Sequence, residues 1–107
     1  MIILLRPPDN GGLSQIGPFI IGPSVSLLFD QATTPVSIKW LLRVDDFVTD
    51  TLYTCELLSH AKSSSTIAPH IRYASSKNGI IDFSINTIIS GGFLNLFITN
   101  NESHNIS

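Results

Sequence analysis

The chain has 107 residues, enough for one domain with a single hydrophobic core and too few for a second. Hydrophobic residues make up 43% of the chain and charged residues only 13%, about half the charged share of an average soluble domain. The formal net charge is −2 and the six lysines and arginines are scattered, so a nucleic-acid-binding role is excluded as the main function. A chain this poor in charge is expected to bury part of its surface against partner subunits.

Residues 1–35 are predicted to form an extended arm. The pairs Gly17-Pro18 and Gly22-Pro23 interrupt its apolar residues. Proline removes a backbone donor and restricts the residue before it, so these pairs exclude a regular helix. They also exclude a membrane-spanning helix, and the apolar run before them is too short for a signal peptide. We therefore expect neither a membrane partner nor secretion.

The arm is expected to lie on its own domain or on a neighbouring subunit. One edge strand is predicted within it, at residues 25–29, because a strand close to prolines is typical of a sheet edge. The arm's largest apolar side chains would make the contact. These predicted interface residues are Ile16, Phe19, Ile20 and Ile21.

Residues 36–107 are predicted to form a domain of strands separated by turns. Apolar and polar residues alternate over residues 36–44, which indicates a half-buried strand with Trp40 on its inner face. Further strands are expected at residues 51–60, at residues 66–74 near an edge, and in a hairpin around Ser90-Gly91-Gly92. No stretch has a sustained helical period. The expected fold is all-β, an antiparallel β-sandwich or a jelly-roll-like arrangement.

The last hairpin has apolar residues on both of its faces. Ile80 and Ile88 lie on the face opposite the main apolar series of the first strand, and Phe93 and Phe97 do so on the second. A free sandwich buries only one face of each strand. We therefore predict that the arm or another subunit covers the outer face of this hairpin, with Phe93 and Phe97 at the interface.

The histidines and the single cysteine do not form a recognisable catalytic or metal motif. His60, His70 and His104 are irregularly spaced, and Cys55 has no second cysteine beside it. Cys55 and His60 stand five residues apart on one predicted strand, so their side chains face opposite sides. Cys55 is expected to be a small buried hydrophobe.

Asp45, Asp46 and Asp50 cluster around the first predicted turn. Several carboxylates together suit calcium, but their spacing matches no EF-hand loop, and aspartate in turns commonly bonds its own backbone. We expect no metal ion and no cofactor. The absence of a Walker-type loop, a nucleophile elbow or a dinucleotide fingerprint predicts a protein without catalytic residues, and hence not an enzyme.

Aromatic residues leave one alternative function open. Trp40, Tyr53 and Tyr73 could form a platform for sugar rings, although Trp40 stands on the apolar face of its strand and is expected in the core. Tyr53 and Tyr73 are also typical of the rim of a protein interface. The alternative function is therefore a carbohydrate-binding module that contacts glycans through these two tyrosines.

Four segments carry a resemblance to a known group of proteins. They are an aromatic-bearing strand (IKWLLRV), a Glu-Leu-Leu segment (CELLSH), a tyrosine-containing strand (IRYAS) and a hairpin with a Ser-Gly-Gly turn (IIDFSINTIISGGFLNLFITNNE). Together, residues 38–106 resemble a small β-domain that recurs in structural proteins of tailed bacteriophages, including cyanophages. Relatives often carry this domain at the end of a longer fibre-like chain, whereas only residues 1–35 stand ahead of it here.

The resemblance implies a non-enzymatic structural protein of the virion, assembled in the host cytoplasm. It would be a small multi-copy subunit of the tail, the baseplate, a fibre connection or the capsid surface. Its partners would be other virion proteins and further copies of itself, in a homo-oligomer, with a host glycan as the alternative ligand.

Overall fold

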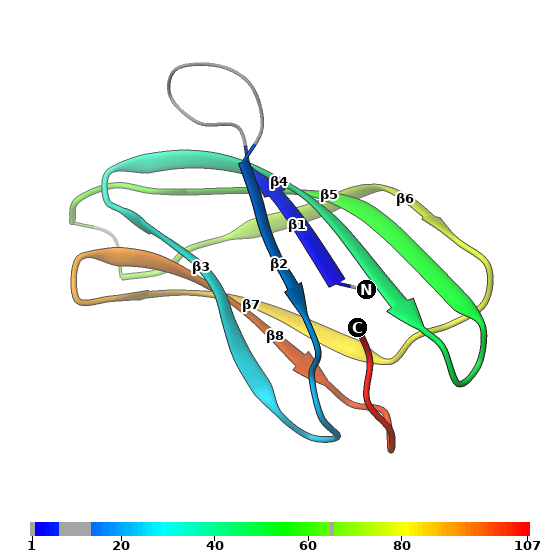
Figure 1. Cartoon of the computed structure of the whole chain (residues 1–107). Coiled ribbons are helices and arrows are strands. Elements are labelled where there is room, and N and C mark those ends of the chain that lie inside the picture. Colours follow the sequence, from blue (N-terminus) through cyan, green and yellow to red (C-terminus); the bar gives the residue numbers. More distant parts are fainter. Residues whose placement is uncertain (1, 7–13, 65) are drawn as a thin grey trace.

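The computed structural model describes residues 2–6, 14–64 and 66–107. It has two antiparallel sheets that pack together, which confirms the predicted all-β sandwich (Figure 1). Along the chain the strands are β1 (Ile2–Arg6), β2 (Ser14–Phe19), β3 (Ser26–Thr33), β4 (Val36–Asp46), β5 (Thr51–Ala61), β6 (His70–Lys77), β7 (Phe83–Ser90) and β8 (Phe93–Asn100). The described residues include no helix of the length and apolar character that crossing a membrane requires.

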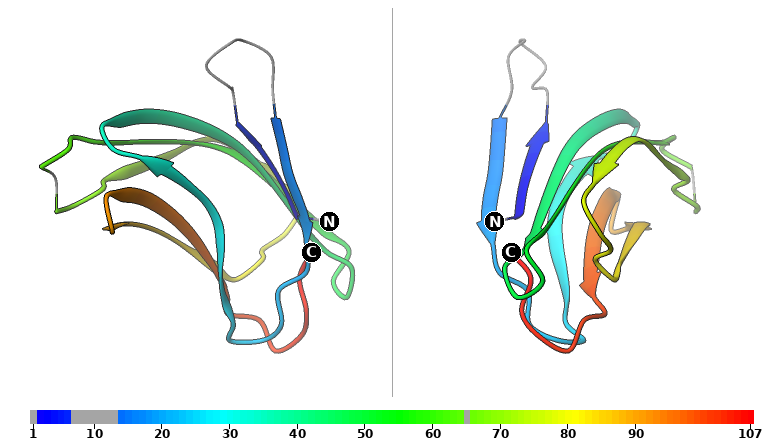
Figure 2. Two further views of the ribbon diagram at one scale, coloured as in Figure 1. Left: turned by 60° about the vertical axis from the view of Figure 1, so that its left-hand side comes forward. Right: turned by 90° about the vertical axis from the view of Figure 1, so that its right-hand side faces the viewer.

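The two sheets differ in size. The larger has five strands in the order β2-β1-β4-β5-β6, and the smaller has three in the order β3-β8-β7. The five-stranded sheet arches over the three-stranded one, so that their facing sides enclose the core (Figure 2). The chain passes from one sheet to the other between β2 and β3, between β3 and β4, and again between β6 and β7.

Strands β4 and β5 form the centre of the core, because their residues alternate strictly between the two faces. Trp40, Leu42 and Val44 of β4 are fully buried, and so is Leu57 of β5. Cys55 is buried beside them. The predictions of an inward Trp40 and a buried cysteine are both confirmed.

The β7–β8 hairpin turns as the sequence predicts. Gly91 and Gly92 both have positive φ, at 62° and 78°, as the type I′ turn of a two-residue hairpin requires. Leu94, Leu96 and Ile98 of β8 lie in the core with no exposed surface. The opposite face of β8 therefore carries Phe93 and Phe97 away from the core.

Residues 1–35 were predicted to form an extended arm with one edge strand, and the structure has three strands in this range, β1, β2 and β3. Strand β1 is hydrogen-bonded to both β2 and β4, and β3 is hydrogen-bonded to β8. The Gly17-Pro18 pair is accommodated in β2 because β2 is an edge strand, where a missing N–H need not leave a ladder bond unmade. The edge strand expected at residues 25–29 corresponds to β3, which continues to Thr33. Residues 1 and 7–13 of the predicted arm lie outside the described part of the chain.

Strand β6 is an edge strand, as predicted, but it lies further along the chain than expected. It begins at His70, directly after Pro69, and extends to Lys77. The strand therefore continues past the expected end at residue 74, and the chain turns after it at Asn78-Gly79. Gly79 has a φ of 106°, and the Asn78 side chain accepts a 2.6 Å hydrogen bond from the Leu52 amide.

His70 joins the two sheets where β6 and β7 face each other. Its Nδ1 lies 2.9 Å from Oγ1 of Thr87, and that hydroxyl donates to the carbonyl of Ala68. Since the threonine proton is used on Ala68, Nδ1 of His70 must be the donor in the first bond. Burial, and then the charge of Arg72, lower the pKa of His70 below its ordinary value of 6.5.

We expect His70 to make the protein less stable in mildly acidic solution. A histidine with a lowered pKa binds fewer protons when folded than when unfolded, so its stabilising contribution is complete above pH 6.5. That contribution is lost as the pH falls from 6.5 to the folded pKa. Urea unfolding between pH 7.5 and pH 5 would measure the slope, which His70→Gln should reduce. The control is His60→Gln at an exposed position, which should leave the dependence of the unfolding free energy on pH unchanged. If His70→Gln also left this dependence unchanged, His70 would not be its source.

Candidate assembly surfaces

The outer face of the three-stranded sheet carries a row of large apolar side chains. Leu28, Ile88 and Phe93 are 42%, 49% and 37% exposed, and Phe97 is half-buried. The strand register brings them together. Phe97 of β8 stands opposite Leu28 of β3, and Ile88 of β7 stands opposite the β8 residue between Phe93 and Phe97. We call Leu28, Ile88, Phe93 and Phe97 the outer apolar face.

Asn95 holds the centre of the outer apolar face in place. It stands between Phe93 and Phe97 on the same side of β8, yet it is almost completely buried. Its Oδ1 accepts a 3.0 Å hydrogen bond from Gln31 of β3. Its Nδ2 donates to the carbonyls of Ile88 and Phe93, each at 3.2 Å. The face is therefore a rigid surface tied across all three strands, which lowers the entropy cost of docking a partner on it.

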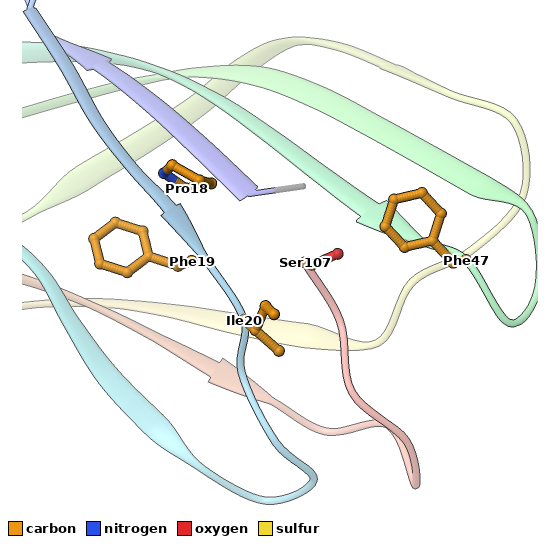
Figure 3. A pocket seen from close by; sticks show the side chains of 5 residues that line it. All are labelled: Pro18, Phe19, Ile20, Phe47 and Ser107. Carbon is orange, nitrogen blue, oxygen red and sulfur yellow. The ribbon is translucent and has the colours of Figure 1, made fainter.

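A second apolar surface lies at one end of the sandwich. A pocket of about 280 Å³ is lined by Pro18, Phe19, Ile20, Phe47 and Ser107 (Figure 3). We call it the end pocket. Ile20 and Phe47 are 71% and 76% exposed, and they stand on either side of Ser107. Such exposure of large apolar side chains around a hollow is typical of a contact site.

The backbone around the end pocket explains why Ile20 points outward. Ile21 is only 1% exposed, and its backbone exchanges two hydrogen bonds with Ile106, at 2.9 and 3.0 Å. Anchoring Ile21 inward turns its neighbour Ile20 to the surface. Phe19 forms part of the wall, with its ring 4.4 Å from that of Phe29 between centroids.

Phe47 is presented by the turn between β4 and β5. The buried side chain of Asp46 holds this turn, since its Oδ1 accepts hydrogen bonds from the amides of Val48 and Thr49. This is the turn chemistry expected for the aspartates there. Asp45 points elsewhere, with a carboxylate oxygen 3.5 Å from the Arg43 guanidinium.

The outer face of the five-stranded sheet is mixed in character. Leu41, Leu58 and Ile71 are exposed on it. Lys39 lies among them, 3.4 Å from the Glu56 carboxylate and 5.9 Å from the centre of the Tyr73 ring. The hydrogen bond to Tyr73 and then the charge of Glu56 raise the pKa of Lys39. Charged groups interrupt the apolar area here, so this face is a poorer contact surface than the other two.

The structure separates the residues predicted to form an interface. Phe93 and Phe97 lie together on the outer apolar face, and Phe19 and Ile20 lie together at the end pocket. Ile16 is half-buried against the core. Ile21 is in the core, so its prediction as an interface residue is wrong. Leu28 and Phe47 were not predicted, because a single apolar residue within an edge strand or a turn gives no periodic signal.

Of the two tyrosines proposed for glycan contact, Tyr53 is not accessible. It is buried, and its ring meets Phe83 edge-on at a centroid distance of 5.2 Å. Its hydroxyl accepts a hydrogen bond from Arg72, and burial raises its pKa. Tyr53 therefore cannot stack on a sugar. Tyr73 is half-buried on the outer face of the five-stranded sheet.

Cys55 and His60 are placed as the sequence predicts, on opposite faces of β5. Cys55 lies in the core and His60 is exposed. Burial raises the pKa of the Cys55 thiol, which disfavours the nucleophilic thiolate form.

The molecule is a β-sandwich with two exposed apolar areas, one on the outside of a sheet and one at an end. Comparisons of the chain with protein-family models, with curated proteins and with solved structures found no match.

Proposed function

We propose that the protein is a non-enzymatic structural subunit of a virion, present in several copies and held by its outer apolar face and its end pocket. It would belong to the tail, the baseplate, a fibre connection or the capsid surface. The observation that carries the proposal is the exposure of large apolar side chains at both surfaces. Ile20 and Phe47 at the end pocket are 71% and 76% exposed, and the outer apolar face includes Leu28 and Ile88, which are 42% and 49% exposed.

Large apolar side chains that remain in water leave stabilising free energy unused. Moving a large apolar side chain from water into an interface contributes about 1.5–3 kcal/mol when burial is complete. A small domain that left several such groups in water would forgo this stabilisation and risk nonspecific association. A partner surface that covers them removes both disadvantages. The low share of charged residues, 13%, fits a molecule whose surface is covered in this way.

The setting in a virion rests on the resemblance of residues 38–106 to the bacteriophage β-domain. The hairpin turn of that resemblance, Ser90-Gly91-Gly92, joins the two strands that carry most of the outer apolar face. The same hairpin would therefore carry both the resemblance to the bacteriophage domain and the interface with a neighbouring subunit.

We expect the purified protein to self-associate through the outer apolar face. The double change of Phe93→Ser and Phe97→Ser should shift the sedimentation coefficient to that of a monomer, because it removes the two aromatic groups at the centre of the face. Thermal unfolding followed by circular dichroism should change less, since neither ring lies in the core. The matched control is Leu41→Ser with Ile71→Ser on the other sheet, which should leave the association unchanged.

Two results would contradict this proposal. One is a wild-type protein that sediments as a monomer up to millimolar concentration. The other is a double variant at Phe93 and Phe97 that loses folding and association to the same extent, since the two rings would then support the fold rather than an interface.

A further inference from the structure

Three side chains of metal-ligand type converge beside the turn between β4 and β5. They are Asp46, Glu102 and His104, whose ligand atoms all lie within 4.8 Å of one another. Nε2 of His104 is 2.7 Å from Oδ2 of Asp46. Asp46 is buried, and Glu102 and His104 are half-buried. The cluster unites the end of β4 with the segment that follows β8, two parts of the chain that are far apart in sequence.

The surrounding hydrogen bonds already orient the two carboxylates. Oδ1 of Asp46 is engaged by the turn amides of Val48 and Thr49, which leaves Oδ2 directed at His104. Oε1 of Glu102 accepts from the Asp82 amide at 2.8 Å. Groups of this kind around ligand side chains hold them in position for a metal.

Asn100 fixes the backbone that carries Glu102 and His104. This buried side chain accepts a 2.8 Å hydrogen bond from the Glu102 amide and donates one of 2.8 Å to the His104 carbonyl. The two ligand residues are thus presented from a turn whose shape is set from inside the core. A site of this kind needs little rearrangement to receive an ion.

We propose that Asp46, Glu102 and His104 form a binding site for a divalent transition-metal ion, with Zn²⁺ as the best fit. Zinc takes carboxylate oxygen and histidine nitrogen at about 2.0–2.2 Å, so ligand atoms around it stand about 3 Å apart or somewhat more. The Asp46–His104 pair needs to open only slightly from 2.7 Å to admit the ion. Open coordination positions would be filled by water.

Charge and ligand type both favour this assignment. Two carboxylates face one imidazole, so the cluster is negatively charged whether the imidazole is neutral or protonated, and a divalent cation offsets that charge. In the described part of the chain, neither Asp46 nor Glu102 forms an ion pair with a lysine or an arginine. The imidazole nitrogen distinguishes zinc and its neighbours from Mg²⁺ and Ca²⁺, which prefer an all-oxygen shell.

The site would act as a clamp on the segment after β8. Ser107 exchanges backbone hydrogen bonds with Asp45, next to Asp46, and also lines the end pocket. An ion held by Asp46, Glu102 and His104 would tie this segment to the β4–β5 turn and stiffen the pocket wall. The inference stands apart from the virion proposal, because metal binding by the isolated protein does not depend on any partner.

The test is thermal unfolding of chelator-treated protein with and without ZnCl₂. Binding to the folded state alone raises the melting temperature, and for a chain of this size a shift of about 5 °C or more is expected when zinc is in large excess over its dissociation constant. His104→Gln and Glu102→Gln should each abolish the shift. Each has a matched control elsewhere on the surface, His60→Gln and Glu56→Gln, which should keep it.

A spectroscopic readout separates a formed site from nonspecific stabilisation. Co²⁺ added to the wild type should produce visible d–d absorption bands, which His104→Gln should lose. The zinc-dependent shift is measured within each variant, so a variant that is itself less stable still reports on binding. No shift in the wild type, an equal shift in His104→Gln, or a shift with Ca²⁺ as large as with Zn²⁺ would each overturn the assignment.

Discussion

Replacing Trp40 with alanine should lower the free energy of unfolding by about 3–5 kcal/mol, the range seen when a large aromatic side chain is removed from a core. Trp40 has no exposed surface and lies at the centre of β4. The change would leave a large cavity between the two sheets. Urea unfolding followed by circular dichroism measures the loss, since Trp40 is the chain's only tryptophan and its fluorescence disappears with it.

Trp40 also connects the two sheets by a hydrogen bond, and Trp40→Phe tests the contribution of that bond to stability. Nε1 of the indole donates a 2.9 Å hydrogen bond to Oδ2 of Asp30, which belongs to β3 in the opposite sheet. Phenylalanine keeps most of the ring but cannot donate, so we expect a smaller loss of about 1–3 kcal/mol. A Trp40→Ala variant no less stable than Trp40→Phe would contradict the central packing role of this side chain.

Asn100→Asp should destabilise the protein by about 2–6 kcal/mol, although the two side chains have nearly the same shape. Nδ2 of Asn100 donates to the carbonyls of Ile21 and His104, at 2.9 and 2.8 Å, and the residue is fully buried. A carboxylate cannot donate, so both carbonyls would lose a partner and face a buried negative charge. Chemical unfolding of the variant, followed by Trp40 fluorescence, measures the effect.

The control for Asn100→Asp is Asn86→Asp, the same change at an exposed position of β7. It should alter the free energy of unfolding by less than about 0.5 kcal/mol. If Asn100→Asp unfolded at the same urea concentration as the wild type, the bonds from Asn100 to Ile21 and His104 would not be essential to the fold.

The strands predicted most closely are those whose pattern is local. The alternation of apolar and polar residues in β4, and the Gly-Gly turn of the β7–β8 hairpin, are enough to predict these strands, because each of them pairs with its neighbour in sequence. Strands β1 and β2 were missed because β1 pairs with β4, which is distant in sequence, and β2 joins the sheet through β1. Local sequence propensity predicts that Gly17-Pro18 interrupts regular structure, whereas the structure places this pair in an edge strand, which tolerates proline.

The contact surfaces were predicted only in part for a similar reason. The run Phe19-Ile20-Ile21 is apolar throughout, so it cannot show which side chain faces inward, and the bridge from Ile21 to Ile106 decides it. Asp46 and His104 stand 58 residues apart, and no local motif could have joined them. Asp46 was correctly assigned to turn chemistry, but the sequence offered no sign that the turn faces a histidine.

The order of strands in the smaller sheet has a consequence for how the protein folds. Its middle strand is β8, and its edge strand β3 is paired across a separation of 73 residues at Ser26 and Thr99. During synthesis β3 must therefore wait, with its backbone groups unpaired, until almost the whole chain has been made. The β4–β5 and β7–β8 hairpins can form early, while joining β3 closes a long loop and is entropically slow. We expect closure of the three-stranded sheet, rather than assembly of the core strands, to set the folding rate.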